Sequence, residues 1–117
     1  MKAADLMIGD WVYNSYHKRN IKWNYSEMFC PNGIPVIGRD LEPIPLTPEI
    51  LEKNGWKETQ YCHEYQDGKN TIQCCLPDMR GIINGIEIEH FECKYVHQYQ
   101  HLLRLCGLDE LADNFKV

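Results

Sequence analysis

The sequence predicts an α+β fold, in which short and mostly antiparallel strands pack with a short central helix and a longer C-terminal helix. Three observations predict it. Helix start and stop signals flank residues 48–53, an amphipathic helical pattern ends at Gly107, and short segments of strand-like residues are bounded by turn pairs. With 117 residues, the chain is expected to form a single domain over residues 1–117.

The N-terminal part is predicted to be rich in strands. A first strand is expected over about residues 10–16, where a Gly-Asp turn pair precedes three residues of high strand propensity. A polar loop over 16–20 and a second strand over 21–25 follow, because apolar and polar residues alternate in the latter segment. A further short strand is expected at 34–37. An aromatic-rich strand after a Gly-Asp turn is typical of small barrels, so this part is expected to be small-barrel-like.

The central helix has the clearest local signals. Residues 41–46 are expected to be extended, because two prolines in this segment remove backbone donors. Thr47 is a good N-cap and Pro48 suits the first helical position, which predicts a helix over about 48–53. The pair Asn54-Gly55 is a natural left-handed stop.

The segment after this helix is predicted to form a hairpin. Residues 59–66 and 70–76 flank Asp67-Gly68, which is a strong two-residue turn signal. Residues 81–85 are rich in turn formers, and an alternating pattern then predicts a strand from Ile86 to about Cys93.

The C-terminal part is predicted to be helical. A long helix begins near residue 95 and ends at Gly107, and Leu108 is expected to close on Leu103 across this stop. A short closing helix follows Leu108. The apolar stripe of the long helix consists of Val96, Tyr99, Leu102, Leu103 and Cys106.

Composition excludes several classes of protein. The net charge of −5 disfavours nucleic acid as the main partner, because phosphate contacts need basic residues. No apolar run approaches the roughly 18 residues of a membrane span, and the N-terminus lacks a secretory signal, so a cytoplasmic protein without membrane contact is expected. In that compartment the six cysteines are expected to be reduced: Cys30, Cys62, Cys74, Cys75, Cys93 and Cys106.

Four segments carry a family resemblance: residues 4–12, 41–56, 86–88 and 95–107. In these segments the chain resembles a family of small uncharacterised proteins of Bacteroides-type gut bacteria, which are often encoded by prophages or mobile elements. The resemblance implies a bacterial, intracellular accessory protein. It implies no activity, and no catalytic residue is carried over from it.

His97 and His101 are the candidate metal ligands, because residues four apart lie on one face of a helix. A zinc protease would also need a glutamate directly after the first histidine, and Gln98 stands there instead. None of the possible further ligands falls in a recognised zinc spacing, so no metal or other cofactor is expected. These further candidates are Cys62, His63, His90 and Cys93.

Residues 16–25 combine cations with aromatic rings. Such a segment suits single-stranded nucleic acid, since bases stack on aromatic faces while cations contact phosphates. The same pattern also describes an exposed hairpin whose aromatic rings lie in the core. The candidate contact residues are Lys18, Arg19, Lys22 and Trp23.

The sequence contains no carboxylate pair marked for acid–base work, no glycine-rich phosphate loop and no serine elbow. The function predicted first is therefore a non-catalytic accessory or protein-interaction module of a bacterial mobile element or prophage, with an unknown protein partner. The alternatives are a weak single-stranded nucleic-acid-contacting module using residues 16–25 and a metal-dependent enzyme using His97 and His101.

Overall fold

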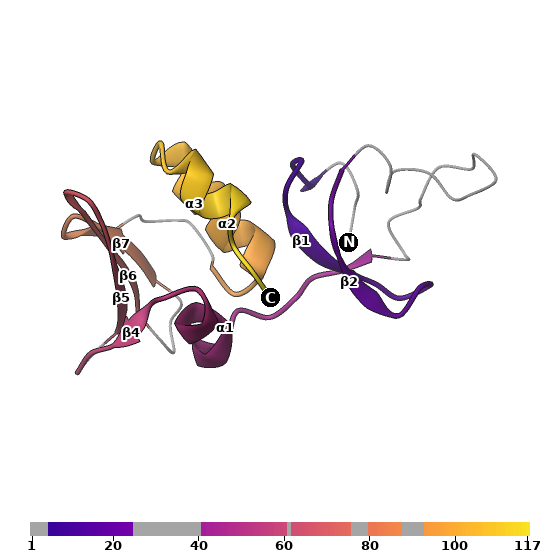
Figure 1. Cartoon of the computed structure of the whole chain (residues 1–117), viewed down its shortest axis with the longest axis horizontal. Helices are drawn as coiled ribbons and strands as arrows, with labels where there is room; N and C mark the ends of the chain where they lie inside the picture. The colour runs from indigo at the N-terminus through magenta and orange to yellow at the C-terminus, as the bar shows by residue number, and fades with distance from the viewer. Residues whose placement is uncertain (1–4, 25–40, 61, 76–79, 88–92) are drawn as a thin grey trace.

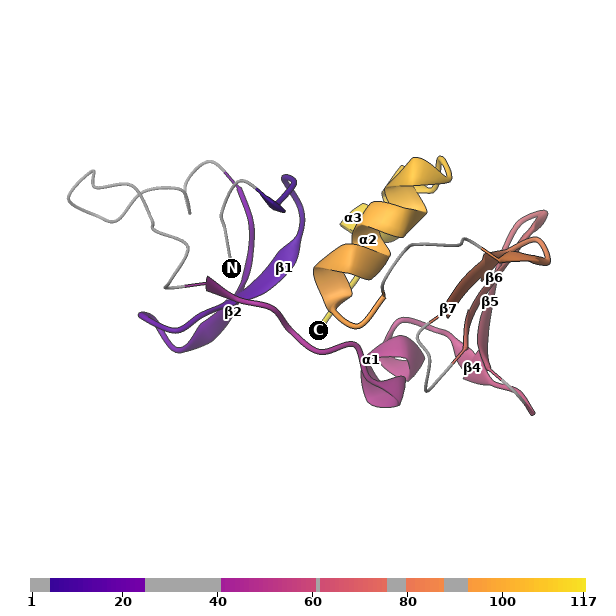
Figure 2. The same cartoon turned by 180° about the vertical axis from the view of Figure 1, so that it is seen from behind.

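The computed structural model describes residues 5–24, 41–60, 62–75, 80–87 and 93–117. These residues form two antiparallel sheets and three helices, which confirms the predicted α+β class. The helices lie between the two sheets, with the N-terminal sheet on one side and the larger sheet on the other (Figure 1). The same layering is visible from behind (Figure 2).

The N-terminal sheet has the order β2-β1-β3 in the described residues. The predicted polar loop over 16–20 is wrong in extent. Lys18 adopts a positive φ of 53°, so the chain reverses within residues 15–18 and Arg19 already pairs with Asn14. The strands are β1 (Trp11–Asn14), β2 (Arg19–Lys22) and β3 (Leu41–Glu42).

A small core of its own supports this sheet. Val12 and Ile21 are paired across β1 and β2, and both are buried. Trp23 and Leu41 complete this cluster, and Leu6 packs against it. The strand predicted at 34–37, Tyr25 of the strand predicted at 21–25, and Cys30 lie outside the described residues, so the small-barrel expectation stays a prediction.

Helix α1 (Pro48–Lys53) has the predicted bounds. The Thr47 side chain accepts a hydrogen bond from the backbone N–H of Ile50 at 3.3 Å, as an N-cap should. At the other end Gly55 adopts a φ of +94°, and the N–H of Trp56 donates to the carbonyl of Leu51 at 3.0 Å. This left-handed stop turns the chain so that Trp56 enters the core.

We expect Thr47→Ala to lower the free energy of unfolding by about 1 kcal/mol, because the first turn of α1 loses its side-chain acceptor. Chemical denaturation followed by circular dichroism measures this change. Thr47→Ser is the matched control, since its hydroxyl can still accept the same bond. Equal stability of the alanine and serine variants would mean that the cap contributes nothing.

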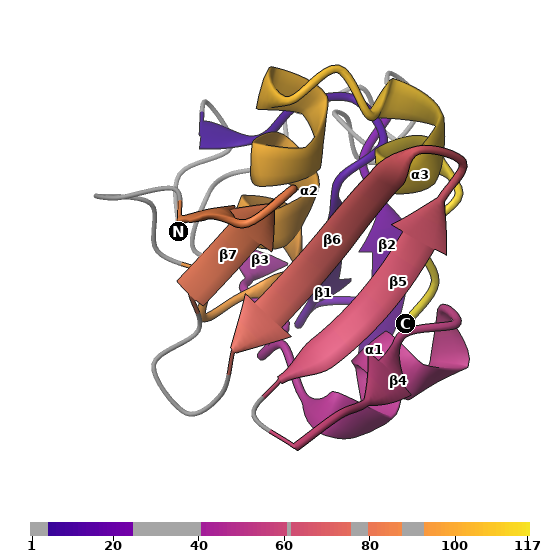
Figure 3. The same ribbon diagram turned by 90° about the vertical axis from the view of Figure 1, so that its left-hand side faces the viewer.

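The larger sheet has the order β4-β5-β6-β7-β8, and all its neighbouring strands are antiparallel. Its inner face covers the helices (Figure 3). The strands are β4 (Lys57–Glu58), β5 (His63–Asp67), β6 (Asn70–Cys75), β7 (Arg80–Ile83) and β8 (Ile86–Glu87).

The hairpin prediction is confirmed, but its turn is shifted by one residue and its first strand begins at His63 rather than at residue 59. Asp67 pairs with Asn70, so the two-residue loop is Gly68-Lys69, with Gly68 at a φ of +58°. The interpretation of residues 81–85 as a turn-rich stretch is wrong in part, because only Asn84-Gly85 forms the turn after β7.

Gly81 explains why β7 has the appearance of a turn in the sequence. A Cβ at this position would lie 2.2 Å from Cδ2 of the buried Leu102, so glycine allows α2 to pack closely on the strand. The strand predicted from Ile86 to Cys93 is described only as far as Glu87, and Cys93 lies outside any strand.

The predicted C-terminal helices are α2 (Val96–Leu105) and α3 (Asp109–Asp113). The N–H of Leu108 donates to the carbonyl of Leu103 at 2.8 Å, and Gly107 has a φ of +77°, so the predicted stop is confirmed. The main core lies between the helices and the larger sheet. It contains Ile44, Leu46, Leu51, Trp56, Ile72, Cys74, Cys93, Val96, Tyr99, Leu102, Leu103, Leu108, Ala112 and Phe115.

None of the five cysteines in the described ranges forms a disulfide bond, and four of them are buried. Burial raises the pKa of Cys74 to about 12, with further contributions from the neighbouring thiols. Burial alone raises the pKa of Cys93 to about 12. Both thiols therefore stay protonated at neutral pH and pack as small apolar groups.

None of the helices in the described part of the chain combines the length and the apolar character that crossing a bilayer requires.

Candidate functional site

The polar residues of α2 form the contact between the helical layer and the N-terminal sheet. Three of them act there: Gln100, His101 and Arg104. Their partners on the side of the N-terminal sheet lie at residues 9–11, about 90 positions away in the sequence. The candidate site is therefore assembled from the two ends of the chain.

Gln100 is fully buried, and its amide group is completely paired. Its Oε1 accepts a hydrogen bond from the backbone N–H of Trp11 at 2.9 Å. Its Nε2 donates to the carbonyl of Gly9 at 2.9 Å and to the carbonyl of Ala112 at 3.0 Å. One side chain thus joins β1, α2 and α3, and a buried amide with all these bonds stabilises one relative position of the three.

Asp10 is fully buried beside Gln100 and is the anionic centre of the site. One carboxylate oxygen accepts a hydrogen bond from the N–H of Met7 at 2.8 Å and lies 2.5 Å from Nε2 of His101. The other accepts from Nη1 of Arg104 at 2.5 Å. The second terminal nitrogen of Arg104 contacts the carboxylate of Asp113 at 3.3 Å.

These contacts decide the charge state of Asp10. Burial by itself would raise the pKa of the carboxyl group, because a charge is costly away from water. The hydrogen bonds from His101, Met7 and Arg104, together with the charge of His101, outweigh burial and lower the pKa. Asp10 is therefore a carboxylate at neutral pH, paired with the Arg104 guanidinium.

His97 and His101 have different surroundings although they share one helical face. Nε2 of His101 contacts Asp10, whereas Nδ1 of the buried His97 has no hydrogen-bond partner among the described residues. The two rings are nearly perpendicular, with centroids 5.7 Å apart. Within the described ranges, the one group of three possible metal ligands that lie close together contains neither histidine. Metal binding by this pair stays a prediction.

Burial lowers the pKa of His97, and the charge of His101 acts in the same direction, while Asp10 and Asp5 partly oppose them. The unfolded chain therefore takes up a proton on His97 more readily than the folded protein does. The neutral His97 therefore contributes to the stability of the fold. This contribution is complete above the unfolded-state pKa of about 6.5, and it is lost as the pH falls from there toward the lower pKa of the folded state.

We expect His97→Phe to reduce the loss of stability that the protein shows between pH 7.5 and pH 5.5. The aromatic ring is kept, but the titrating group is removed. Denaturation midpoints at the two pH values, measured for both proteins, give the difference. An unchanged pH dependence would show that His97 carries no proton linkage.

A pocket of about 690 Å³ opens directly over the Asp10 network. Three exposed apolar side chains line it, namely Met7 (47% exposed), Ile8 (45%) and Leu105 (74%). We name it the Leu105 pocket. Its polar lining consists of His101, Arg104, Asp109 and Asp113.

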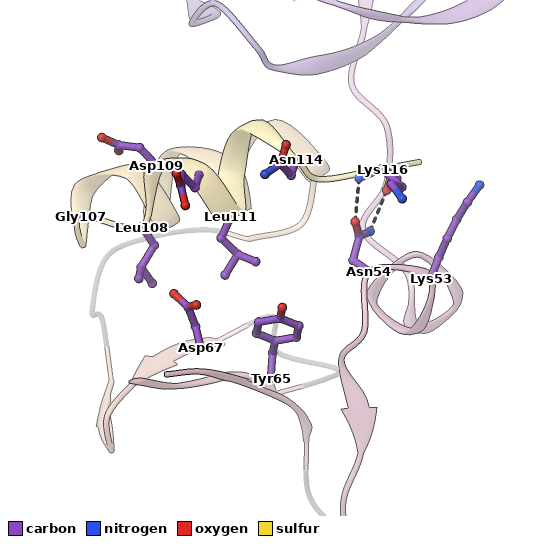
Figure 4. Close-up of a pocket in the computed structure, with 11 residues that line it drawn as sticks. Lys53, Asn54, Tyr65, Asp67, Gly107, Leu108, Asp109, Leu111, Asn114 and Lys116 are labelled. Carbon is purple, nitrogen blue, oxygen red and sulfur yellow. Dashed lines mark hydrogen bonds between the residues drawn. The ribbon is translucent and has the colours of Figure 1, made fainter. Parts of the chain in front are cut away.

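A second pocket, the Tyr65 groove, lies between α3 and the β5–β6 hairpin. Leu108, directly before α3, and Leu111, within it, extend toward Tyr65 and Asp67 of β5 (Figure 4). The other lining residues of the groove are mostly polar or charged. The apolar side chains of the groove either belong to the main core or pack against it. Asn54 closes one end, because its amide bonds the backbone N–H and carbonyl of Lys116, both at 2.7 Å. The groove is therefore the less suitable of the two pockets for an apolar partner.

The structure separates the basic-aromatic residues rather than gathering them. Trp23 is buried in the N-terminal core, so the face of its ring is not available for base stacking. Nζ of Lys22 donates to the backbone carbonyl of Asp113. Lys18 and Arg19 are exposed at the β1–β2 turn. Nucleic-acid contact by this segment stays a prediction.

Sequence reasoning identified His101 but missed Asp10 and Gln100. Gln100 lies four residues after Val96 and three before Leu103, so it is a polar residue on the apolar stripe of α2. A polar side chain on a buried face needs hydrogen-bond partners, so the position of Gln100 in the sequence could have indicated a buried polar contact. Asp10 had only the signal of a turn residue.

The chain matches no protein-family model, and no curated protein or solved structure is significantly similar to it. The resemblance to small Bacteroides-type proteins therefore stays a prediction.

Proposed function

We propose that this protein is a non-catalytic interaction module that binds a segment of a protein partner in the Leu105 pocket. One observation carries the proposal. Among the described residues, five large apolar side chains are strongly exposed, and three of them, Met7, Ile8 and Leu105, line this one pocket. Apolar side chains that gather on a surface, with polar groups around them, are typical of protein-interaction sites.

The polar rim indicates the chemistry of the partner. Arg104 is already paired with Asp10 and Asp113, so its charge is largely neutralised within the protein. The other charged groups on the lining are the carboxylates of Asp109 and Asp113, which are both exposed. Together with the net charge of −5, they favour a partner segment that presents an apolar side chain next to lysine or arginine.

The rest of the lining argues for binding rather than catalysis. A histidine held by a buried carboxylate can act as a general base, and His101 with Asp10 has this arrangement. However, Arg104 shares the same carboxylate, and the side chains that line the pocket include no serine, threonine or cysteine that His101 could activate. The network instead holds the turn that carries Met7 and Ile8.

The biological setting is part of the same proposal. The sequence resemblance favours an accessory protein of a bacterial prophage or mobile element, working in the cytoplasm. A small acidic module with an apolar surface pocket fits such a role, because it needs only a partner segment and no substrate.

Selection from a random library of twelve-residue peptides tests the proposal. The immobilised full chain and the immobilised variant Leu105→Asp are used in two parallel selections. We expect enrichment of peptides in which an apolar residue stands next to lysine or arginine. Enrichment of acidic peptides, or of peptides that bind the variant equally well, would overturn the proposal.

A further inference from the structure

Three side chains of types that bind metals lie together at the β4 edge of the larger sheet. None of them lines the Leu105 pocket. Glu52 is in the last turn of α1, Glu58 is in β4 and His63 is in β5. The pairing of β4 with β5 places Glu58 directly opposite His63. Because α1 is followed closely by β4, Glu52 also reaches this point.

The three side chains converge. One ligand atom from each of Glu52, Glu58 and His63 lies within 4.8 Å of the other two. Nε2 of His63 is 3.5 Å from Oε1 of Glu52. A tetrahedral zinc ion with ligands at about 2.0–2.2 Å requires donor atoms roughly 3.4 Å apart. Both glutamates are exposed, so small side-chain rotations can supply the remaining movement.

His63 provides an independent reason to expect a ligand. The residue is only 6% exposed, and its Nε2 is buried with no hydrogen-bond partner in the part of the chain that the structure describes. Its distance from Glu52 exceeds the ~3.2 Å limit of an ordinary N–H···O bond. A buried unpaired nitrogen is costly, whereas the same nitrogen is a good metal ligand when it is neutral.

We propose that Glu52, Glu58 and His63 form a binding site for a divalent transition-metal ion, with zinc as the best fit. The two carboxylates supply negative charge, and the imidazole favours zinc over magnesium and calcium, which prefer oxygen ligands alone. Three protein ligands leave a position for water. The site shares no residue with the His97–His101 pair and does not depend on the Leu105 pocket.

Isothermal titration of the chelator-treated full chain with zinc chloride tests the site. We expect one zinc ion per chain. Removing a residue that only hydrogen-bonds to a metal ligand typically weakens metal binding by roughly tenfold or more. His63→Ala removes a ligand itself, so it should weaken zinc binding by at least about tenfold. Glu58→Gln should weaken it as well, and because Glu58 is exposed this variant tests the site without disturbing the core. His17→Ala, which changes an exposed histidine in the β1–β2 turn, is the matched control and should bind like the wild type.

Two further readouts separate this site from binding by thiols. Cobalt(II) in place of zinc should give no intense thiolate charge-transfer band, and Cys62→Ser should leave the affinity unchanged. Zinc should also raise the denaturation midpoint of the wild type but not that of His63→Ala. Absence of zinc binding, a thiolate band, or equal affinity in Glu58→Gln and the wild type would overturn the proposal.

Discussion

Asp10→Ala is expected to lower the free energy of unfolding by about 3 kcal/mol or more. Removing one member of a buried ion pair leaves the other charge without compensation, which typically costs about 3–5 kcal/mol. Here the Arg104 side chain, only 11% exposed, would lose its closest carboxylate, and the contact with His101 would also disappear. Urea denaturation at pH 7 measures the loss.

Asp113→Ala is the matched control, because its carboxylate contacts the same Arg104 guanidinium. Its side chain is 58% exposed, and exposed pairs contribute about 1 kcal/mol or less. A loss for Asp10→Ala no larger than the loss for Asp113→Ala would show that the buried network does not stabilise the fold.

The pH dependence provides a second measurement on the same group. Folding lowers the pKa of Asp10, so its stabilising effect is complete above the unfolded-state pKa of about 3.9 and is lost as the pH falls through the folded-state value. The wild type should therefore lose stability below about pH 4 more steeply than Asp10→Ala.

Trp56→Ala is expected to cost about 3–5 kcal/mol, a large share of the roughly 5–15 kcal/mol that stabilises an ordinary domain. Trp56 is 1% exposed and stacks on Tyr65, with ring centroids 4.6 Å apart. It also meets Tyr99 and Phe115 edge to face at 5.8 and 5.7 Å. Truncation would open a cavity between the sheet and the helices, and denaturant unfolding measures the loss.

Trp56→Phe is the control for this prediction. The phenylalanine keeps an aromatic ring against Tyr65, Tyr99 and Phe115 and leaves a smaller cavity than alanine would. We expect it to cost clearly less than alanine. Equal losses for the two variants would mean that the aromatic contacts are not what Trp56 contributes.

Local signals in the sequence were sufficient for the elements that contain their own start and stop residues. Thr47, Pro48 and Gly55 define α1 without help from the rest of the chain. The strand β7 was missed because Gly81 has the propensity of a turn residue. It is a strand residue here because it pairs with β6, and glycine is needed because Leu102, 21 positions later, occupies the space that a side chain would take.

The candidate site was only partly predictable for the same reason. His101 was identifiable from its spacing to His97, but its partner Asp10 is 91 positions away in the sequence. Only the packing of α2 against the N-terminal sheet brings the two together. Trp23 shows the converse case, because its sequence neighbours suggested a stacking surface while the sheet places the ring in the core.

The network and the pocket are connected through one turn. The N–H of Met7 donates to Asp10, and the carbonyl of Gly9 accepts from Gln100. These bonds hold the turn that presents Met7 and Ile8 beside Leu105. The polar contacts that join the two ends of the chain thereby also shape the proposed binding surface.

The most direct test of the proposed function is the dissociation constant of one selected peptide for three proteins, measured by fluorescence anisotropy. Leu105→Ser removes an apolar side chain of the pocket that is 74% exposed, and Ile86→Ser removes a similarly exposed one outside it (66% exposed). We expect Leu105→Ser to weaken binding at least about tenfold, which corresponds to roughly 1.4 kcal/mol, and Ile86→Ser to leave it unchanged. Equal affinity of the peptide for all three proteins would contradict a partner site in the Leu105 pocket.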